Sequence, residues 1–169
     1  MANPEVWLRG PVEGYAPELQ PVVHALLQAV EDVEMATRAL TVDELWTKPG
    51  GAASVGFHMK HLPGALDRLL TYARGEALTG NQKAALAAED DSGSPPASAA
   101  DLLAQLRSGV DRALAQVRTT RVESLLDTRG VGRAGLPTTV LGLLFHAAEH
   151  STRHAGQIIT TAKIVRGTT

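Results

Sequence analysis

Four long stretches of this chain repeat their apolar residues at the spacing of an α-helix, and this pattern constrains the fold more than any other feature. The pattern predicts helices over residues 17–39, 55–74, 99–118 and 140–166. Apolar side chains three or four positions apart form one stripe, which each helix must bury against its neighbours. No segment has a convincing strand pattern. We therefore expect an all-α fold, a four-helix bundle.

The connections between these stretches carry turn and capping signals. Thr41 with Glu44 predicts a capping box that opens a short helix over 42–46, and short helices are also expected over 81–89 and 120–127. Ser54, Ser98 with Asp101, and Thr138 or Thr139 are positioned to cap the later long helices. The glycine-rich segment 128–139 lacks the lysine of a phosphate-binding loop, so it is interpreted as a flexible crossover. Pro63 lies inside the second long helix and predicts a kink there.

Composition sets the class of protein. The 169 residues are interpreted as a single domain over 1–169, with residues 1–16 as an N-terminal arm. The formal net charge of −2, with no basic cluster, argues against nucleic acid as a partner. Prolines and charges near the start do not fit a signal peptide, and no run is long and apolar enough to span a membrane. A cytoplasmic location is expected. Cysteine is absent, so any metal must be held by histidine, carboxylate or water.

Three of the six histidines recur every four residues within the last long stretch, at His146, His150 and His154. Residues four apart lie one above the other on a helix, so His150 and His154 can reach one metal ion. The zinc-protease motif has this spacing but needs glutamate directly after its first histidine, where this chain has Ser151. Upstream, His58 and His61 offer a third ligand if the two helices are neighbours. Three imidazoles with one open position are typical of a catalytic metal site.

Two of these segments together resemble the DinB/YfiT-like superfamily of bacterial metal-binding four-helix bundles. The segment SVGFHMKHLPGALDRLLTYARG resembles the family's second-helix motif, and LPTTVLGLLFHAAEHSTRHAGQI resembles its fourth-helix motif. LTVDELWTKPGG is similar to the linker between helices one and two, so the resemblance spans roughly residues 17–167. It implies a bundle with short extra helices in the connections. It also implies that His61, His150 and His154 are the metal ligands, with Gln157 completing the last motif.

The other histidines match no ligand position of the family. His58 is interpreted as a pocket wall, a support for a ligand or a packed residue, and His146 as a pocket or supporting residue. Ligands on three successive turns would spread over about 12 Å, too far for one ion to bind both His146 and His154. His24 is interpreted as incidental. Glu149, Gln157 and Asp67 are available to accept a hydrogen bond from the outer nitrogen of a ligand ring, the one that faces away from the metal. Arg68 and Arg153 are either solvated charges or contacts for an anionic substrate.

The resemblance implies a metal-dependent transfer or isomerisation in which a low-molecular-weight thiol binds the open metal position. Zn²⁺ or Ni²⁺ is expected, with Fe²⁺ and Cu²⁺ as alternatives, because three imidazoles suit all four ions. A small-molecule substrate and a homodimer are also expected. Three alternatives stay open at this point: a metal-binding or stress-response bundle without turnover, a metal-dependent hydrolase, and histidines packed without any metal.

Overall fold

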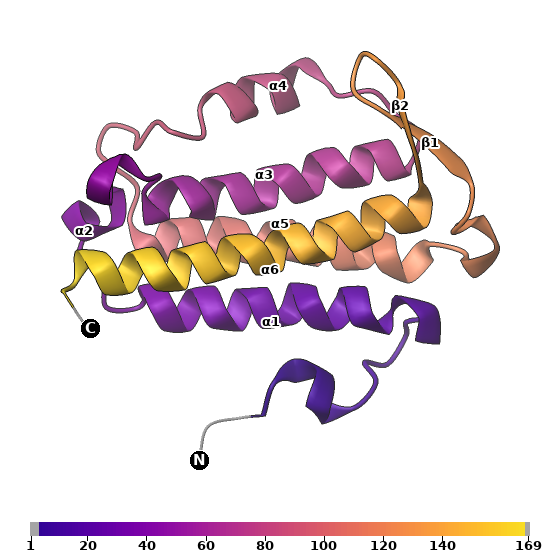
Figure 1. Ribbon diagram of the computed structural model, residues 1–169, viewed down its shortest axis with the longest axis horizontal. Helices are drawn as coiled ribbons and strands as arrows, with labels where there is room; N and C mark the ends of the chain where they lie inside the picture. Colours follow the sequence, from indigo (N-terminus) through magenta and orange to yellow (C-terminus); the bar gives the residue numbers. More distant parts are fainter. Residues whose placement is uncertain (1–3, 168–169) are drawn as a thin grey trace.

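The computed structural model describes residues 4–167 and confirms the all-α four-helix bundle (Figure 1). The long helices are α1 (Gln20–Thr37), α3 (Val55–Ala73), α5 (Ala99–Thr119) and α6 (Val140–Val165). Two shorter helices, α2 (Val42–Trp46) and α4 (Gly80–Ala87), lie in the connections, together with strands β1 (Thr128–Val131) and β2 (Leu136–Thr139). Single 3₁₀ turns occur at Val6–Arg9, Pro17–Leu19, Pro49–Gly51 and Val122–Ser124. No described helix is both long and apolar enough to cross a membrane.

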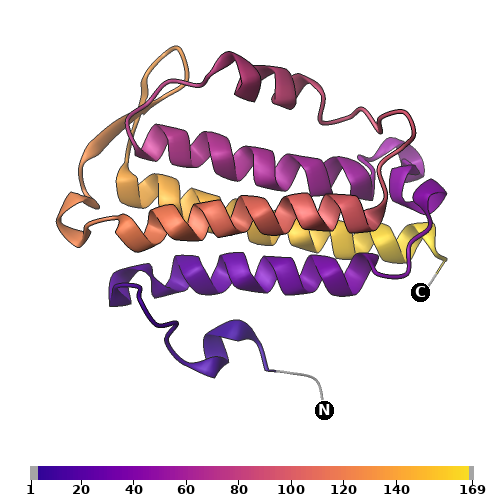
Figure 2. The ribbon, with the colours of Figure 1, turned by 180° about the vertical axis from the view of Figure 1, so that it is seen from behind.

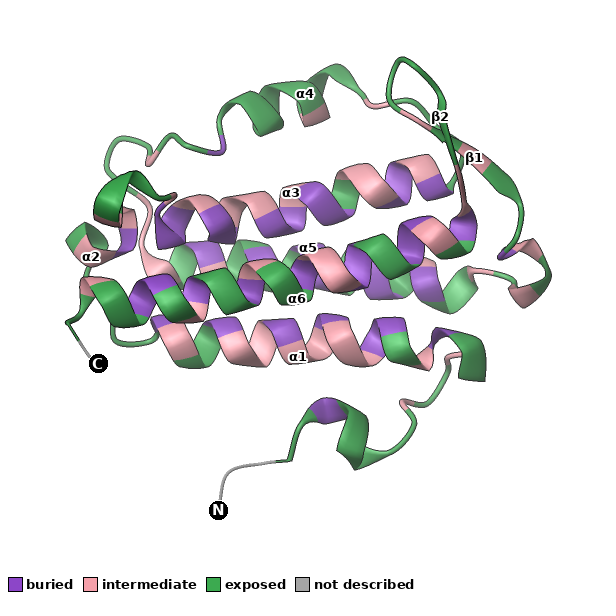
Figure 3. Ribbon diagram, viewed as in Figure 1, coloured by how far each residue is buried: buried purple, intermediate pink, exposed green. Residues whose placement is uncertain are grey.

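The four long helices enclose one apolar core. Helix α6 packs between α1 and α3, and α5 packs against α3 and α1 on the opposite side of the bundle (Figures 1 and 2). Buried residues line the inward faces of these helices, whereas α4 is exposed along most of its length (Figure 3). The largest buried side chains include Leu26, Met59, Leu66, Leu106, Leu144 and Ile158. This core fixes α3 beside α6, which positions the candidate site.

Side-chain caps begin α2, α3, α5 and α6 where the sequence predicts them. The Ser54 hydroxyl accepts a hydrogen bond from the Phe57 backbone N–H at 3.1 Å. Thr41 with Glu44, and Ser98 with Asp101, form complete capping boxes at α2 and α5. At α6 the cap is Thr139, whose hydroxyl accepts from the Gly142 N–H at 3.0 Å. These side chains satisfy backbone donors that the first turn of a helix leaves free.

Two connections differ from the prediction. Segment 128–139 is a β-hairpin and not a flexible crossover, with Thr128 opposite Thr139 and Val131 opposite Leu136. Gly132 and Gly135, at φ +70° and +61°, supply the left-handed backbone of its turn. The expected helix over 120–127 is only the 3₁₀ turn Val122–Ser124.

At the N-terminus, Arg9 pairs with Glu31 of α1 at 2.6 Å, so the expected arm packs along the bundle. Residues 1–3 of the arm lie outside the described residues.

Helix α3 continues through Pro63, the position at which the sequence predicts a kink. Pro63 is buried and faces Gly109 of α5, where a Cβ on the glycine would lie 2.6 Å from the Pro63 Cβ. The glycine therefore makes room for the proline ring, and the two helices pack closely two residues beyond His61.

Candidate metal centre

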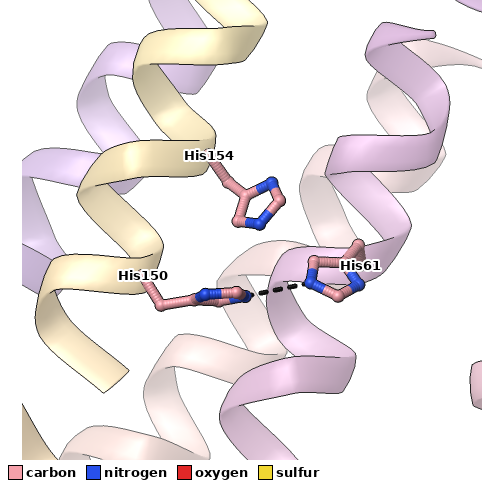
Figure 4. A group of neighbouring side chains, drawn as sticks. All are labelled: His61, His150 and His154. Carbon is pink, nitrogen blue, oxygen red and sulfur yellow. Dashed lines mark hydrogen bonds between the residues drawn. The ribbon is translucent and has the colours of Figure 1, made fainter. Parts of the chain in front are cut away.

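Two helices bring three histidines together. His61 lies on α3, and His150 and His154 lie one turn apart on α6. One nitrogen from each ring lies within 4.8 Å of the other two. The rings face one another, and the Nε2 atoms of His61 and His150 are 2.9 Å apart (Figure 4). Two nitrogens bound to one tetrahedral zinc ion are about 3.3 Å apart, given bonds of about 2.0 Å. The cluster therefore fits a single divalent ion and leaves a fourth position without a histidine ligand.

The electrostatic setting keeps two of these rings neutral. Burial, followed by the neighbouring charges of His61, Arg153 and His146, lowers the pKa of His150 to about 4. Burial and the adjacent histidines lower the pKa of His154 to about 3. Only neutral imidazole has a free lone pair for a metal. At neutral pH these two rings are therefore uncharged, and each has a lone pair on one of its two nitrogens.

His58 lies behind the cluster, against His154. Its side chain is buried, and its Nδ1 is 2.9 Å from the Nδ1 of His154. Burial, with a smaller contribution from His61, lowers the pKa of His58. A neutral His58 can accept the hydrogen bond that His154 Nδ1–H donates, which would leave His154 Nε2 unprotonated. The structure thus places His58 against His154, one member of the three-histidine cluster.

His61 is held from two sides. The ring of Phe57 stacks on it, with centroids 5.5 Å apart and planes 13° apart. Its Nδ1 lies 2.7 Å from the carboxylate oxygen Oε2 of Glu89. Glu89 is buried, and its other oxygen accepts a hydrogen bond from Arg68 at 2.7 Å. Glu89 therefore holds the outer nitrogen of His61, and sequence reasoning missed it.

The acidic and amide side chains singled out in the sequence lie elsewhere. Asp67 accepts a hydrogen bond from Gln82 at 2.7 Å. Gln157 is exposed, and among residues 4–167 it makes no hydrogen bond to the three histidines. Glu149 pairs with His146 at 2.6 Å and with Arg153 at 2.8 Å. None of the three touches the outer nitrogen of a clustered histidine.

The remaining histidines lie outside the cluster. His146 is exposed, and with Glu149 and His150 it forms a second group whose potential ligand atoms lie within 4.8 Å of one another. Arg153 donates both to Glu149 and, at 3.3 Å, to His150 Nδ1, so a guanidinium already occupies the edge of this second group. His24 contacts the Gly10 carbonyl, 3.1 Å from its Nε2.

The fold and the cluster together define a four-helix bundle with a three-histidine group suited to a divalent metal ion. Residues 25–158 match the sequence profile of the DinB superfamily, and the chain belongs to that superfamily.

Two solved structures share this fold. One, described as the conserved protein of a locus from Enterococcus faecalis, has 21% sequence identity and a TM-score of 0.69, covering 88% of this chain and 97% of its own. The other is YfiT from Bacillus subtilis, with 20% identity and a TM-score of 0.67, covering 95% of this chain and 94% of its own. YfiT is described as a probable metal-dependent hydrolase with an unusual four-helix bundle topology. No curated protein matches the chain.

Proposed function

We propose that this protein binds one divalent transition metal ion through His61, His150 and His154, and that a small molecule reacts at the open fourth position. The observation that carries the proposal is the convergence of three imidazole nitrogens from α3 and α6 within 4.8 Å. Zn²⁺ or Ni²⁺ is the proposed ion, and Fe²⁺ or Cu²⁺ would suit the same donors. Three protein ligands are typical of catalytic sites, whereas structural zinc sites fill all four positions with protein.

The proposed reaction is transfer or isomerisation that uses a low-molecular-weight thiol. A bound divalent ion would lower the pKa of a coordinated thiol and make its sulfur nucleophilic at neutral pH. The chain has no cysteine, so the thiol must come from outside. Phe57 and His58 hold the rings of His61 and His154 in place. Arg153 lies beside His150 and places a positive charge next to the site, where an anionic thiol or substrate would bind.

A metal-dependent hydrolase is the second candidate, favoured by the description of YfiT. Hydrolysis needs a base that takes a proton from water. Glu149 is the carboxylate next to His150 in the chain, and His146 and Arg153 already hold it. Because these two side chains already engage the Glu149 carboxylate, it is less available as the base for hydrolysis, and the thiol reaction is favoured. A bundle that holds a metal without turnover is the remaining alternative.

The metal is tested first. Elemental analysis of untagged protein should find about one equivalent of transition metal, which His61→Ala, His150→Ala and His154→Ala should each abolish. His24→Ala is the matched control, because His24 lies outside the cluster. Wild-type protein that stays metal-free after incubation with Zn²⁺ and Ni²⁺ would refute the proposal.

The reaction is tested on zinc-loaded protein with glutathione, bacillithiol or mycothiol and an aryl halide. In the expected reaction a sulfur–carbon bond forms, the halide leaves with its electron pair, and the thiol proton goes to solvent. Hydrolysis of a nitrophenyl ester without thiol would instead favour the hydrolase. Absence of both reactions would favour the bundle without turnover.

The proposal includes a homodimer in the cytoplasm. Leu141 and Phe145 are apolar residues at the start of α6, with 39% and 65% of their surfaces exposed. Contiguous exposed apolar surface is typical of contact sites between proteins, and these two side chains lie one turn apart on α6. Light scattering on the purified protein should give twice the monomer mass, and a monomer mass at all concentrations would remove the dimer from the proposal.

A further inference from the structure

We propose that Glu89 selects the tautomer of His61 that can bind the metal, an inference that rests on the proposed metal centre. The carboxylate oxygen Oε2 lies 2.7 Å from His61 Nδ1. An ionised carboxylate only accepts hydrogen bonds, so His61 must donate from Nδ1–H. A neutral imidazole protonated on Nδ1 has its lone pair on Nε2. That atom is the one that faces His150, 2.9 Å away.

Helix α3 holds the segment that carries Glu89 in place. The Lys60 ammonium donates to the carbonyls of Ala88 and Asp91, each at 2.6 Å, so it fixes the backbone on both sides of Glu89. Arg68 donates to the second carboxylate oxygen at 2.7 Å. The connection from α4 runs alongside α3 in this part of the fold (Figure 1). Glu89 is therefore held through the backbone on either side of it and at both of its carboxylate oxygens.

A glycine makes room for this carboxylate. A Cβ on Gly64 would lie 2.9 Å from Glu89 Oε1 and 2.9 Å from Arg68 Nη1. Lys60, Gly64 and Arg68 are spaced four residues apart, so they lie on one face of α3. On that face Lys60 holds the backbone around Glu89, and Gly64 leaves space for the carboxylate. Arg68 binds one carboxylate oxygen, and the other oxygen reaches His61. These contacts assign the connection after α4 a role at the metal centre.

Replacement of Glu89 by glutamine separates this role from mere packing. Glutamine has one accepting oxygen and one donating NH₂ group, while Arg68 can only donate. The amide oxygen must therefore face Arg68, and the NH₂ group must face His61 Nδ1. A donor at Nδ1 favours the opposite tautomer of His61, with its proton on Nε2. In Glu89→Gln the metal-binding nitrogen of His61 is then blocked by a proton, although the shape of the side chain is unchanged.

Removal of the Arg68 guanidinium should rescue the glutamine variant. When Arg68→Met removes the competing donor, the glutamine amide can rotate and turn its oxygen toward His61. The double variant Arg68→Met/Glu89→Gln should then regain the Nδ1–H tautomer and part of its zinc affinity. Arg68→Met alone measures the effect of the lost charge. A double-mutant cycle over the four proteins isolates the coupling between the two sites.

The experiment uses two measurements on the full chain. Long-range ¹H–¹⁵N spectra of the metal-free protein report the tautomer of each ring, and the His61→Ala spectrum identifies the His61 signal. Competition titration with Zn²⁺ gives the affinity. Loss of a partner of this kind typically costs 10–100-fold in metal affinity, which is the decrease we expect for Glu89→Gln. Asp90→Asn is the control, because Asp90 is adjacent, exposed and paired only with Lys48 among the described contacts.

The outcomes distinguish this inference from the metal centre itself. A His61 ring that stays protonated on Nδ1 in Glu89→Gln, with zinc affinity equal to that of Asp90→Asn, would overturn the role of Glu89 and leave the metal centre intact. A double variant no tighter than Glu89→Gln, after correction for Arg68→Met, would also overturn it. Wild-type protein that binds no zinc would refute the metal centre. The tautomer spectra need no metal, so they would still decide what Glu89 does to His61.

Discussion

Replacement of Gly109 by alanine should push helices α3 and α5 apart. A Cβ at this position would lie 2.6 Å from the Pro63 Cβ and 3.2 Å from the Pro63 Cα. Carbon atoms in contact are about 3.5–4.0 Å apart, so the helices would have to separate by about 1 Å. The rigid ring of Pro63 has no side-chain rotation by which it could move away. Overpacking of this kind costs about 1–3 kcal/mol of folding free energy.

Gly156 provides a matched control on α6. It is exposed, and a Cβ on it would meet nothing within 4 Å. Alanine is more favourable than glycine inside a helix by about 1 kcal/mol. Gly156→Ala should therefore stabilise the protein by about that amount, whereas Gly109→Ala gains the same helix preference and loses the packing. The two variants should differ by about 1–3 kcal/mol, which is the steric cost alone.

Urea denaturation of the metal-free protein, followed by far-ultraviolet circular dichroism, measures both free energies of unfolding. Wild-type protein and the two glycine variants should show the same dependence on urea, so that midpoints compare directly. Equal stabilisation by both substitutions would show that Pro63 and Gly109 are not in close contact, and would refute this account of how α3 and α5 pack.

The free energy of unfolding of the metal-free protein should fall as the pH falls from about 6.5 toward 4. The pKa values of His150 and His154, about 4 and about 3, are lower than those of the same residues in the unfolded chain, so the unfolded chain binds protons first. Equal urea midpoints at pH 7 and pH 5 would contradict this prediction. Ser98→Ala should lower the free energy of unfolding by about 1 kcal/mol because it removes the α5 cap, as measured by thermal denaturation. His146→Ala should keep the full zinc stoichiometry, because His146 is exposed and bound to Glu149; loss of zinc in elemental analysis would place His146 among the ligands.

The fold could be predicted where local sequence determines it. Apolar spacing and hydroxyl caps act within one or two turns, so Ser54, Thr41 and Ser98 mark the helix starts that the structure has. The hairpin over 128–139 was missed because its two short strands contain no fully buried residue and lack an alternating apolar pattern. Its main signals are two glycines in the turn, and glycine-rich segments also form irregular loops.

The site was predictable only in part. The four-residue spacing of His150 and His154 follows from helix geometry alone. Glu89 could not be found in this way, because its contact with His61 joins α3 to an irregular connection 28 residues away. No periodicity links these positions. The contact exists because Lys60 and Arg68 hold the connection against α3. Such contacts between residues distant in the sequence produce no local sequence pattern from which they could be predicted.

The spacing of the histidines does not decide whether His58 or His61 faces both histidines of α6, but the relative direction of α3 and α6 does. Helices α3 and α6 run antiparallel, so His58 meets His154 while His61, one turn further along α3, meets His150. Each of these pairs has two ring nitrogens 2.9 Å apart, and spacing alone does not separate them. The ring of His61 lies 5.1 Å from His150 and 4.5 Å from His154, centroid to centroid, and so it faces both residues of α6. Among the described ring contacts with α6, His58 reaches His154 alone, at 5.0 Å. An ion placed between the three grouped rings, as we propose, would therefore bind His61, whereas His58 contacts the group at His154.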